Sequence, residues 1–418
     1  MIIQKAYKYQ LKISKSRQQE IENKLTSFAG CRRFVWNKAL ALQKEKLDNK
    51  EYIFKYIELA SQLVFWKKQE DTKFLANCHS QILQQALKQL DVALRNAFSK
   101  KSKQKFPKFK KKGVNDSFVY PQGFKVDTEN KRIFLPKIGY IAFRMDRPPK
   151  GTPKNITISK NNGKWYASIQ VELKVETPKH TAASAVGIDL GVASTVATSN
   201  AEIKAFKPLE LKKQEGKIKY LQRQLARRGK YKHNWQKTKQ KLNKLHTKVS
   251  NKRKHHLHNI SHKLSKNHAM IVVEDLKIAN MVKSAKGTAE KHGKNVKQKS
   301  GLNRSILRQG WGELIRQIEY KQEWRGGIVI AVNPKYTSQK CSKCGHIHKG
   351  NRKSQSNFTC LNCWHSENAD INAAKNILAA GHAVLACGET VRPRDEIYKH
   401  IYQLEAGSVK QEPSCRID

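Results

Sequence analysis

The chain has 418 residues, of which 38% are hydrophobic, so it is long enough for two or three domains with real cores. Its 83 Lys and Arg against 33 Asp and Glu give a formal net charge of +50. So large a surplus would weaken a compact state without an anionic partner, and we expect nucleic-acid binding. Without a long apolar run or an apolar signal core, we expect neither membrane insertion nor secretion, but a cytoplasmic, nucleoid-associated protein.

The first part of the chain is predicted to be β-rich, with helices between its strands. Residues 1–12 alternate weakly and predict a strand, whereas residues 16–100 repeat apolar side chains at helical spacing and predict several short helices. Pro107 ends this helical region. Residues 115–178 contain short β-type runs separated by Pro, Gly and Asn, which favour a small β-barrel or sandwich. If the first strand joins these runs, the helical region is an insertion.

The next part begins with strands and continues with basic helices. Three strands in a row are expected over 185–206, followed by a long helical pair over 208–266. Acids are nearly absent from this pair, so phosphate contact is favoured over a solvated coiled-coil hairpin. The apolar run at 270–276 predicts a buried strand.

The last third is predicted to contain a mobile segment, two helices and one strand. Residues 283–302 are rich in Lys, Gly and Ser and are expected to be mobile without a partner. A helix is expected over 306–324 and a strand over 327–332. A final helix is expected from about Asn368 to Ala380, and the residues from Gly381 onward lack clear periodicity.

Four of the eight cysteines have the spacing of a metal site. They form a Cys-x2-Cys-x15-Cys-x2-Cys pattern, which suits four thiolates around one tetrahedral zinc ion, with iron as the main alternative. Such a site is closed to water and therefore structural. The remaining thiols are expected to be buried or incidental. The predicted ligands are Cys341, Cys344, Cys360 and Cys363, and the scattered cysteines are Cys31, Cys78, Cys387 and Cys415.

Without the cysteine-rich segment, the second half has the element order of a ribonuclease-H-like α/β fold. Such folds hold two divalent metals on acids from separate elements, and hard cations need oxygen ligands. Asp189 from the first of these strands, Glu274 from the fourth and Asp370 from the last helix are the candidates. Gly187 and Gly191, on either side of Asp189, would permit close approach by a metal or a phosphate.

Two of these three acids have a competing neighbour. Alternation along a strand sends Glu274 and Asp275 to opposite faces, so only one of them joins the site. Glu367 and Asp370 would share a helix face, and Glu367 could instead stabilise the helix dipole. The pattern alone leaves both choices open.

Five motifs occur in the second half of the chain in a fixed order. They are Val186-Gly-Ile-Asp189-Leu-Gly, Val272-Val-Glu274-Asp-Leu276, Leu302-Asn-Arg-Ser-Ile306 with Trp311-Gly-Glu-Leu, Tyr336-Thr-Ser-Gln-Lys-Cys341-Ser-Lys-Cys344-Gly, and Asp370-Ile-Asn-Ala-Ala-Lys-Asn-Ile. Together they resemble the TnpB family, the IS200/IS605-type transposon-encoded nucleases related to Cas12. The resemblance covers essentially the whole chain.

The resemblance implies a multidomain α+β fold. An N-terminal β-barrel, or wedge, domain carries a helical recognition insertion, and a RuvC-like nuclease domain carries an inserted zinc ribbon. A flexible tail follows. The implied ranges are 1–12 and 113–182 for the wedge, 13–112 for the recognition insertion, 183–380 for the nuclease, 335–366 for the ribbon, and 381–418 for the tail.

The resemblance also assigns the site and the activity. It resolves both ambiguities in favour of Asp189, Glu274 and Asp370, which would hold two Mg²⁺ ions. It implies an RNA-guided DNA endonuclease that uses a guide RNA from the transposon end and cuts double-stranded DNA beside a short adjacent motif. Since nothing in the sequence indicates a dimer interface, we expect a monomer with RNA. Tyr52 and Gln84 match positions that touch this motif in relatives. The alternatives are a nuclease-silent RNA-guided repressor and a DNA-strand-transfer transposase.

Overall fold

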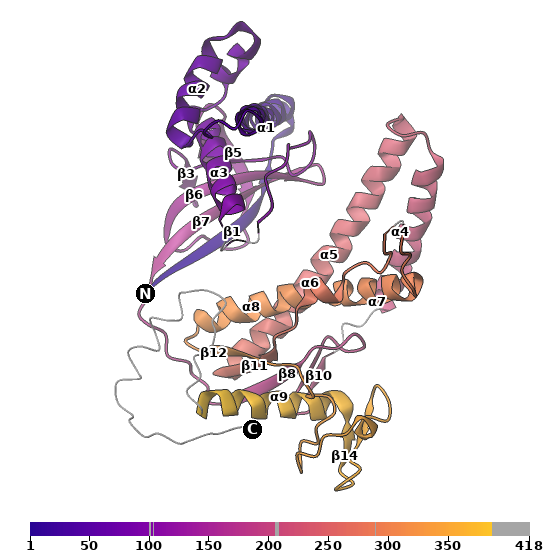
Figure 1. Cartoon of the computed structure of the whole chain (residues 1–418). Helices are drawn as coiled ribbons and strands as arrows, with labels where there is room; N and C mark the ends of the chain where they lie inside the picture. The colour runs from indigo at the N-terminus through magenta and orange to yellow at the C-terminus, as the bar shows by residue number, and fades with distance from the viewer. Residues whose placement is uncertain (100–101, 103, 205–208, 289, 387–418) are drawn as a thin grey trace. The chain divides into compact units, whose positions relative to one another are not determined.

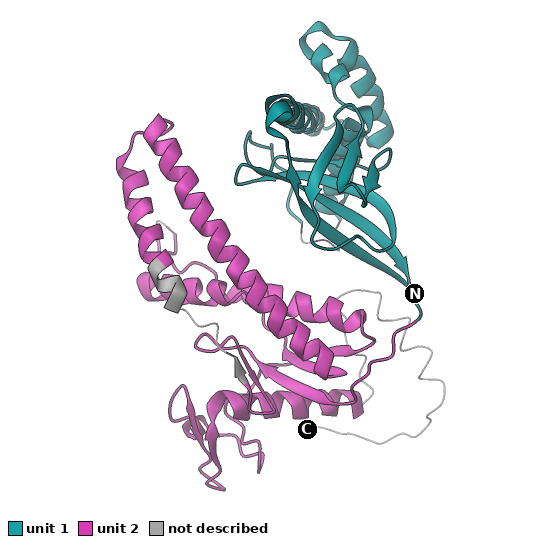
Figure 2. Cartoon of the chain, turned by 180° about the vertical axis from the view of Figure 1, so that it is seen from behind, with its two compact units in different colours: residues 1–176 teal, residues 177–418 magenta. Residues whose placement is uncertain are grey.

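The structure is a computed structural model that describes residues 1–99, 102, 104–204, 209–288 and 290–386. The chain divides into two compact units, Met1–Glu176 and Thr177–Asp418 (Figure 2). Each unit has its own sheet and its own buried core, and each is described separately.

Unit 1 is built on a seven-stranded antiparallel sheet in the order β2-β6-β7-β1-β5-β4-β3. The first strand, β1, lies between β5 and β7, which confirms that it joins the later strands. The strands are β1 Ile2–Lys12, β2 Ser117–Tyr120, β3 Lys125–Asp127, β4 Arg132–Leu135, β5 Gly139–Arg144, β6 Thr152–Asn161 and β7 Lys164–Lys174.

The two edges of this sheet are β2 and β3. Among the described residues no pairing joins these two strands, so the sheet is open by its hydrogen bonds. Its closure into a barrel stays a prediction.

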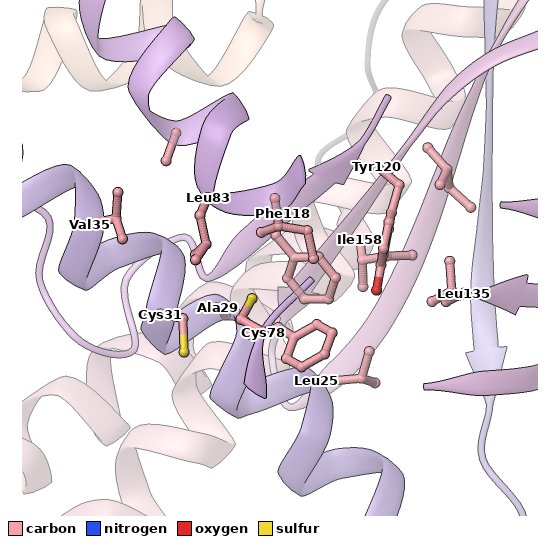
Figure 3. Close-up of a cluster of buried hydrophobic side chains, with 14 of the residues drawn as sticks. Leu25, Ala29, Cys31, Val35, Cys78, Leu83, Phe118, Tyr120, Leu135 and Ile158 are labelled. Atoms are coloured by element: carbon pink, nitrogen blue, oxygen red, sulfur yellow. The ribbon is translucent and has the colours of Figure 1, made fainter. Parts of the chain in front are cut away.

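Helices inserted between β1 and β2 cover this sheet. They are α1 Gln18–Asp48, α2 Tyr56–Lys68 and α3 Ser80–Phe98, with short 3-10 segments at Lys15–Arg17 and Glu70–Asn77. The expectation of only short helices is wrong, because α1 runs for 31 residues. Figure 3 shows Leu25 and Leu83 from α1 and α3 beside Phe118 and Ile158 from the sheet. Cys31 and Cys78 are buried in the same core, as expected for structural thiols.

Unit 2 contains a five-stranded sheet in the order β10-β9-β8-β11-β12. The strands β8, β11 and β12 are parallel, whereas β9 and β10 are antiparallel additions. Their bounds are β8 Ala185–Asp189, β9 Val196–Thr198, β10 Ile203–Lys204, β11 Met270–Glu274 and β12 Ile328–Val332.

Helices cover both faces of this sheet, so that unit 2 has three layers with the sheet in the middle (Figure 1). One face packs against α5, α7 and α8 through a core that includes Leu264, Ile306 and Leu314, and the other packs against α9 through Ile377. The helix bounds are α4 Leu209–Arg227, α5 His233–Asn267, α6 Ile278–Met281, α7 Val296–Gln309, α8 Trp311–Glu323 and α9 Ala369–Ala386. The order of strands and helices is the order predicted from the sequence.

Two predicted boundaries in unit 2 are wrong. The helix expected over 306–324 is two helices, because Gly310 adopts a φ of 72° between α7 and α8. This left-handed conformation is one that glycine adopts readily, and it turns the chain. The first of these helices begins at Val296, so the latter part of the segment expected to be mobile is helical.

The last helix is longer than predicted. It runs through Gly381 to Ala386, because Gly381 packs against Val272 of β11 and does not end the helix. Residues 381–386 are therefore not part of a tail, and the rest of the predicted tail, with Cys387 and Cys415, lies outside the described residues. In the part of the chain that the structure describes, no helix is long and apolar enough to cross a membrane.

A small module links β12 to α9. It contains the 3-10 turn Lys349–Asn351 and a two-stranded antiparallel sheet of β13 Asn357–Thr359 and β14 Ser366–Asn368. Phe358 and two of the cysteines form its buried centre.

Two glycine substitutions in helices of unit 2 should change stability in opposite directions. A Cβ at Gly381 would lie 2.4 Å from Val272 Cγ2, so Gly381→Ala should destabilise by about 1–3 kcal/mol through overpacking. A Cβ at Gly301 in α7 meets nothing within 4 Å, so Gly301→Ala should stabilise by about 0.5–1 kcal/mol. Urea unfolding midpoints measure both, and equal effects of the same sign would contradict this packing of α9.

Candidate active site and metal centre

The first two acids lie at the same edge of the unit 2 sheet. The parallel strands β8 and β11 pair in register, with Ile188 opposite Val273. Asp189 and Glu274 are the next residues, so they end adjacent strands about 4.8 Å apart. The carboxyl ends of neighbouring parallel strands are where α/β folds gather functional side chains.

The third acid reaches this edge from the opposite layer. The Asn368 side chain accepts hydrogen bonds from the backbone N–H groups of Asp370 (3.0 Å) and Ile371 (3.4 Å), so it caps the start of α9. The Ser194 hydroxyl, from the loop after β8, donates to Asp370 Oδ2 at 3.4 Å. The Asp370 carboxylate therefore lies against the segment that follows Asp189.

Gly187 has a different role from the one expected. A Cβ there would lie 2.1 Å from the Ala374 carbonyl oxygen of α9, so this glycine permits close packing of the helix on β8. A Cβ at Gly191 would lie 2.9 Å from the Ser194 carbonyl oxygen and 3.8 Å from Asp370 Oδ2. Of the two glycines, only Gly191 lies beside an acid of the site.

The electrostatics of the three acids reflect their convergence. Burial, followed by the charges of Glu274 and Asp370, raises the pKa of Asp189 to about 7, although the Arg352 charge opposes the shift. Burial also raises the pKa of Glu274, against a lowering effect of Thr337. Because Glu274 and Asp370 both disfavour the charged form of Asp189, the three half-buried carboxylates form a site with an affinity for cations.

Two residues that sequence reasoning missed hold the carboxylates in place. The Thr337 hydroxyl donates to Glu274 Oε1 at 2.6 Å. The Arg352 guanidinium donates from Nη2 to Asp370 Oδ1 at 3.3 Å. Thr337 lies within the quoted Tyr336-Thr-Ser motif, but nothing in its spacing identified Glu274 as its partner.

The structure distinguishes the competing acids. Asp275 is exposed, whereas Glu274 is half-buried and acts on the charge of Asp189. The expectation that Glu367 shares a helix face with Asp370 is wrong, because Glu367 belongs to β14 and α9 begins at Ala369. Glu367 instead pairs with Lys375.

The four predicted cysteines form a compact cluster. Their sulfur atoms all lie within 4.8 Å of one another, with Cys341 and Cys363 at 3.7 Å and Cys344 and Cys360 at 3.6 Å. A metal–sulfur distance of about 2.3 Å in a tetrahedron requires sulfur separations of about 3.8 Å. The His346 backbone N–H, followed by Cys363, lowers the pKa of Cys344 to about 6, which favours the thiolate that a metal needs. The cluster can therefore bind a structural metal.

The cysteine module is fastened to the helix that carries Asp370. The buried Asn372 side chain accepts from the Ser342 N–H at 2.9 Å and donates to the Lys340 carbonyl at 2.8 Å. One turn later, Asn376 donates to the carbonyls of Thr337 (2.9 Å) and Lys340 (2.6 Å). These hydrogen bonds therefore connect α9 to the segment that contains both Cys341 and Thr337, the hydrogen-bond partner of Glu274.

The carboxylates fit divalent cations rather than a single soft metal. All three donors are oxygen atoms, which hard cations such as Mg²⁺ prefer. Among the described residues, the cysteines form the only group of three or more ligands found close enough together to hold one metal ion.

Tyr52 and Gln84 lie in unit 1, on exposed surface. Tyr52 is 65% exposed beside Lys55, whose Nζ lies 5.8 Å from the Tyr52 ring centroid. Gln84 is exposed on α3, one turn before Lys88. A hollow of about 640 Å³ extends from Tyr52 to Arg95 of α3. A contact of these side chains with DNA stays a prediction.

An acid cluster at strand ends, a cysteine metal site fastened to it and a strongly basic surface are together typical of metal-dependent nucleases. Comparisons with known proteins agree with this class. The chain is 52% identical to the putative RNA-guided DNA endonuclease InsQ of Escherichia coli K12, over 93% of this chain and 94% of InsQ. It is 30% identical to a putative RNA-guided DNA endonuclease of Streptomyces pristinaespiralis, over 98% and 96% of the two chains. The chain belongs to the TnpB family of IS605-type transposon proteins.

Three family models match separate segments. They are described as a probable transposase at 168–285, a Cas12f1-like TNB domain at 311–377 and a helix-turn-helix domain at 1–51. The last description does not fit the structure, because residues 1–51 contain strand β1, a short 3-10 segment and the single helix α1.

Among solved structures, the fold is similar to that of Cas12f1 in a complex with sgRNA and target DNA. The TM-score is 0.54 at 14% identity, over 90% of this chain and 98% of that one. The protein therefore has a Cas12-like multidomain α+β fold.

The raised pKa of Asp189 predicts a pH-dependent stability in metal-free protein. The folded state holds a proton on Asp189 that an unfolded Asp, with a pKa near 3.9, has released. The free energy of unfolding should therefore fall as the pH rises from about 4 to about 7. Asp189→Asn should stabilise the protein above pH 7, by up to about 4 kcal/mol at about 1.4 kcal/mol per pKa unit, and have little effect near pH 4.

Urea unfolding over a pH series, in a chelator of divalent ions, measures this difference. Added Mg²⁺ at pH 8 should stabilise the wild type and leave Asp189→Asn nearly unchanged. A difference between the two proteins that stays constant from pH 4 to pH 8 would contradict the convergence of the acids.

The cysteine cluster predicts one bound metal ion per chain. Cys341→Ser should remove that metal, because three thiolates and a hydroxyl no longer complete the site. Cys31→Ser, which changes a buried thiol of unit 1, should retain it. Elemental analysis of purified protein gives the metal content, and retention of metal by both Cys341→Ser and Cys360→Ser would refute the assignment.

Proposed function

We propose that the chain is an RNA-guided DNA endonuclease encoded by a transposon, which cleaves target DNA next to a short adjacent motif. The observation that carries this proposal is the convergence of Asp189, Glu274 and Asp370 from two strands and a helix. Relatives that align over nearly their whole length are named for this activity.

The reaction we propose is hydrolysis of a phosphodiester in this acid cluster. Two Mg²⁺ ions on these carboxylates would lower the pKa of an attacking water and stabilise the leaving oxygen. The chain's own contribution is to hold the ligands. Thr337 orients Glu274, while Ser194 and Arg352 fix the two oxygens of Asp370.

The cysteine cluster we assign to one structural zinc ion. Four thiolates leave no open position for water or substrate. The module has a small core around Phe358, which metal ligation would complete. Zinc would then hold Thr337 and Arg352 in their contacts with Glu274 and Asp370.

The domain assignment is part of the same proposal. Residues 1–12 and 113–182 form the wedge, 13–112 the recognition insertion, and 183–380 a RuvC-like nuclease with the ribbon at 335–366. The place of β1 in the middle of the unit 1 sheet supports an inserted helical region. The mixed five-stranded sheet with helices on both faces supports a ribonuclease-H-like nuclease.

The partners we propose are a guide RNA from the transposon end and double-stranded target DNA. One chain that holds both needs a large positive charge, and this chain carries +50. Base pairing would supply the sequence specificity, while the protein reads the adjacent motif and the backbone. Tyr52 and Gln84 are the candidates for motif contact, and the site of action would be the cytoplasm, at the nucleoid.

Two other functions make different predictions. A nuclease-silent repressor would bind guided DNA without cutting it, and the three retained acids disfavour this function. A strand-transfer transposase would join DNA ends, and one matching family model is described as a probable transposase. Sequencing the reaction products for cuts and for insertions distinguishes all three.

Asp189→Asn should abolish cleavage of a guide-matched DNA while leaving RNA-dependent DNA binding nearly intact. The amide keeps the shape of the side chain but removes a ligand charge. Cleavage and gel-shift assays on the same preparation measure both properties. Asp275→Asn, at the exposed neighbour of Glu274, is the matched control and should cut like wild type. Equal cutting by Asp189→Asn and the control would show that the site is elsewhere.

A further inference from the structure

The hairpin of α4 and α5 has an aromatic pair at its tip that the proposed nuclease site does not use. The two helices run antiparallel and extend away from the unit 2 sheet (Figure 1). At the turn, the rings of Tyr231 and Trp235 lie 5.4 Å apart between centroids. Lys239 Nζ lies 4.7 Å from the Trp235 ring centroid.

The Tyr231 ring is presented to solvent by a braced turn. Its side chain is 76% exposed, and its φ of 67° is left-handed, which is unfavourable for a bulky residue. Arg228 donates to the Asn234 carbonyl at 2.9 Å, and Gln236 donates to the Tyr231 carbonyl at 2.9 Å. The chain therefore holds a strained conformation that exposes an aromatic face, a combination that is frequent at binding sites.

A cationic groove leads from this tip along the hairpin. It encloses about 720 Å³ between α4 and α5, and the exposed ring of Tyr220 lies in its wall. The two acids of the hairpin, Glu210 and Glu215, lie at the start of α4, and no Asp or Glu follows until Glu274, so the tip and the whole of α5 lack acids. The basic residues that line the groove are Lys217, Arg228, Lys237, Lys241, Lys244 and Lys248.

A purely structural role explains this arrangement poorly. An aromatic pair that only closed a turn would gain stability by burying Tyr231, which remains exposed. A solvated surface helix normally balances its lysines with acids at i+3 or i+4, and the hairpin has no acid from residue 216 to the end of α5. Aromatic faces beside a basic groove are the arrangement that proteins use for unpaired nucleic-acid strands.

We propose that the Tyr231–Trp235 tip is a stacking site for an unpaired nucleobase of the bound RNA, with the adjoining phosphates in the lysine groove. The proposal rests on the proposed function only in taking RNA as the bound polyanion. Folded RNA offers unpaired bases in loops and ends before any target is bound, whereas duplex DNA offers them only after the guide has opened it. Because the site would bind a base by stacking on its flat face, it would accept any of the bases and require no particular RNA sequence.

Binding of model oligonucleotides tests the stacking contact. Tyr231→Asn with Trp235→Ala removes both rings, and Asn tolerates the left-handed turn, so the hairpin should fold. We expect this variant to bind oligoadenylate RNA about tenfold or more weakly, because a stacked base contributes about 1–3 kcal/mol. An abasic oligodeoxynucleotide of the same length should bind equally to variant and wild type, because it carries phosphates and no bases.

Two matched variants complete the design. Tyr231→Phe keeps the ring and should bind oligoadenylate like wild type. Lys237→Gln with Lys241→Gln should weaken both ligands alike, because it removes only charge. Loss of binding to the abasic ligand in the ring variant, or unchanged binding to oligoadenylate, would overturn the stacking role.

Ultraviolet crosslinking of the purified RNA–protein complex identifies the source of the base. A ribonucleotide adduct on Tyr231 or Trp235, found by mass spectrometry, supports the proposal. An adduct that is only deoxyribonucleotide and forms only after target DNA is added would overturn the RNA assignment. Guided cleavage by the wild-type complex is scored separately, so failure of the endonuclease proposal is distinguishable from failure of the stacking site.

Discussion

The structure of unit 2 depends on holding Asp189 together with two carboxylates that disfavour its charge, Glu274 and Asp370, at one edge of a sheet. Asp189 and Glu274 are brought level by the parallel register of β8 and β11, which the buried Val and Ile side chains of these strands fix. Asp370 comes from the other layer and needs α9 to lie close to β8. Gly187 provides that closeness, since any side chain there would collide with the helix backbone.

The cysteine module belongs to the same constraint. Asn372 and Asn376 tie the segment from Thr337 to Ser342 to the first turns of α9. Because Thr337 and Arg352 then contact Glu274 and Asp370, the module is also a support for the carboxylates. The module lies immediately before α9 in the chain, and its contacts with α9, Glu274 and Asp370 support the acid site.

The basic hairpin of α4 and α5 bears on the positive charge of the chain and not on the acid site. A chain with a charge of +50 is stable when an anionic partner lies along its cations, and the α4–α5 hairpin concentrates cations with no acid from residue 216 to its end. The hairpin is continuous with the nuclease sheet, because the C-terminal part of α5 packs on it through Leu257, Ile260 and Leu264. Contact with a nucleic acid along the hairpin would therefore act on an element rooted in the core of the nuclease sheet.

The sequence predicted what is encoded by local spacing and missed what depends on long-range packing. Cysteine spacing and the apolar strands around Asp189 and Glu274 identified the cluster and the sheet. The strand pattern left Glu274 and Asp275 open and only the family resemblance chose Glu274, because the register between β8 and β11 that places it beside Asp189 is contained in no local pattern. Thr337 and Arg352 acquire their partners only when the module folds back on α9, so their residue types alone carried no signal.

The errors in the predicted helix boundaries at two glycines also come from long-range packing. Gly310 breaks a helix because its φ is positive, whereas Gly381 continues one because it packs against Val272. Both look alike in a sequence, because only the tertiary neighbours distinguish a stop from a close contact.

The most direct test of the account is to exchange the guide while keeping the protein unchanged. The purified complex is assembled with either of two guides and offered two DNAs, each matched to one guide and each carrying the same adjacent motif. We predict that Mg²⁺-dependent cleavage occurs only in the DNA that matches the guide, and that exchanging the guide exchanges the DNA that is cut. Cleavage that ignores the guide, or joined DNA ends in place of cuts, would contradict it.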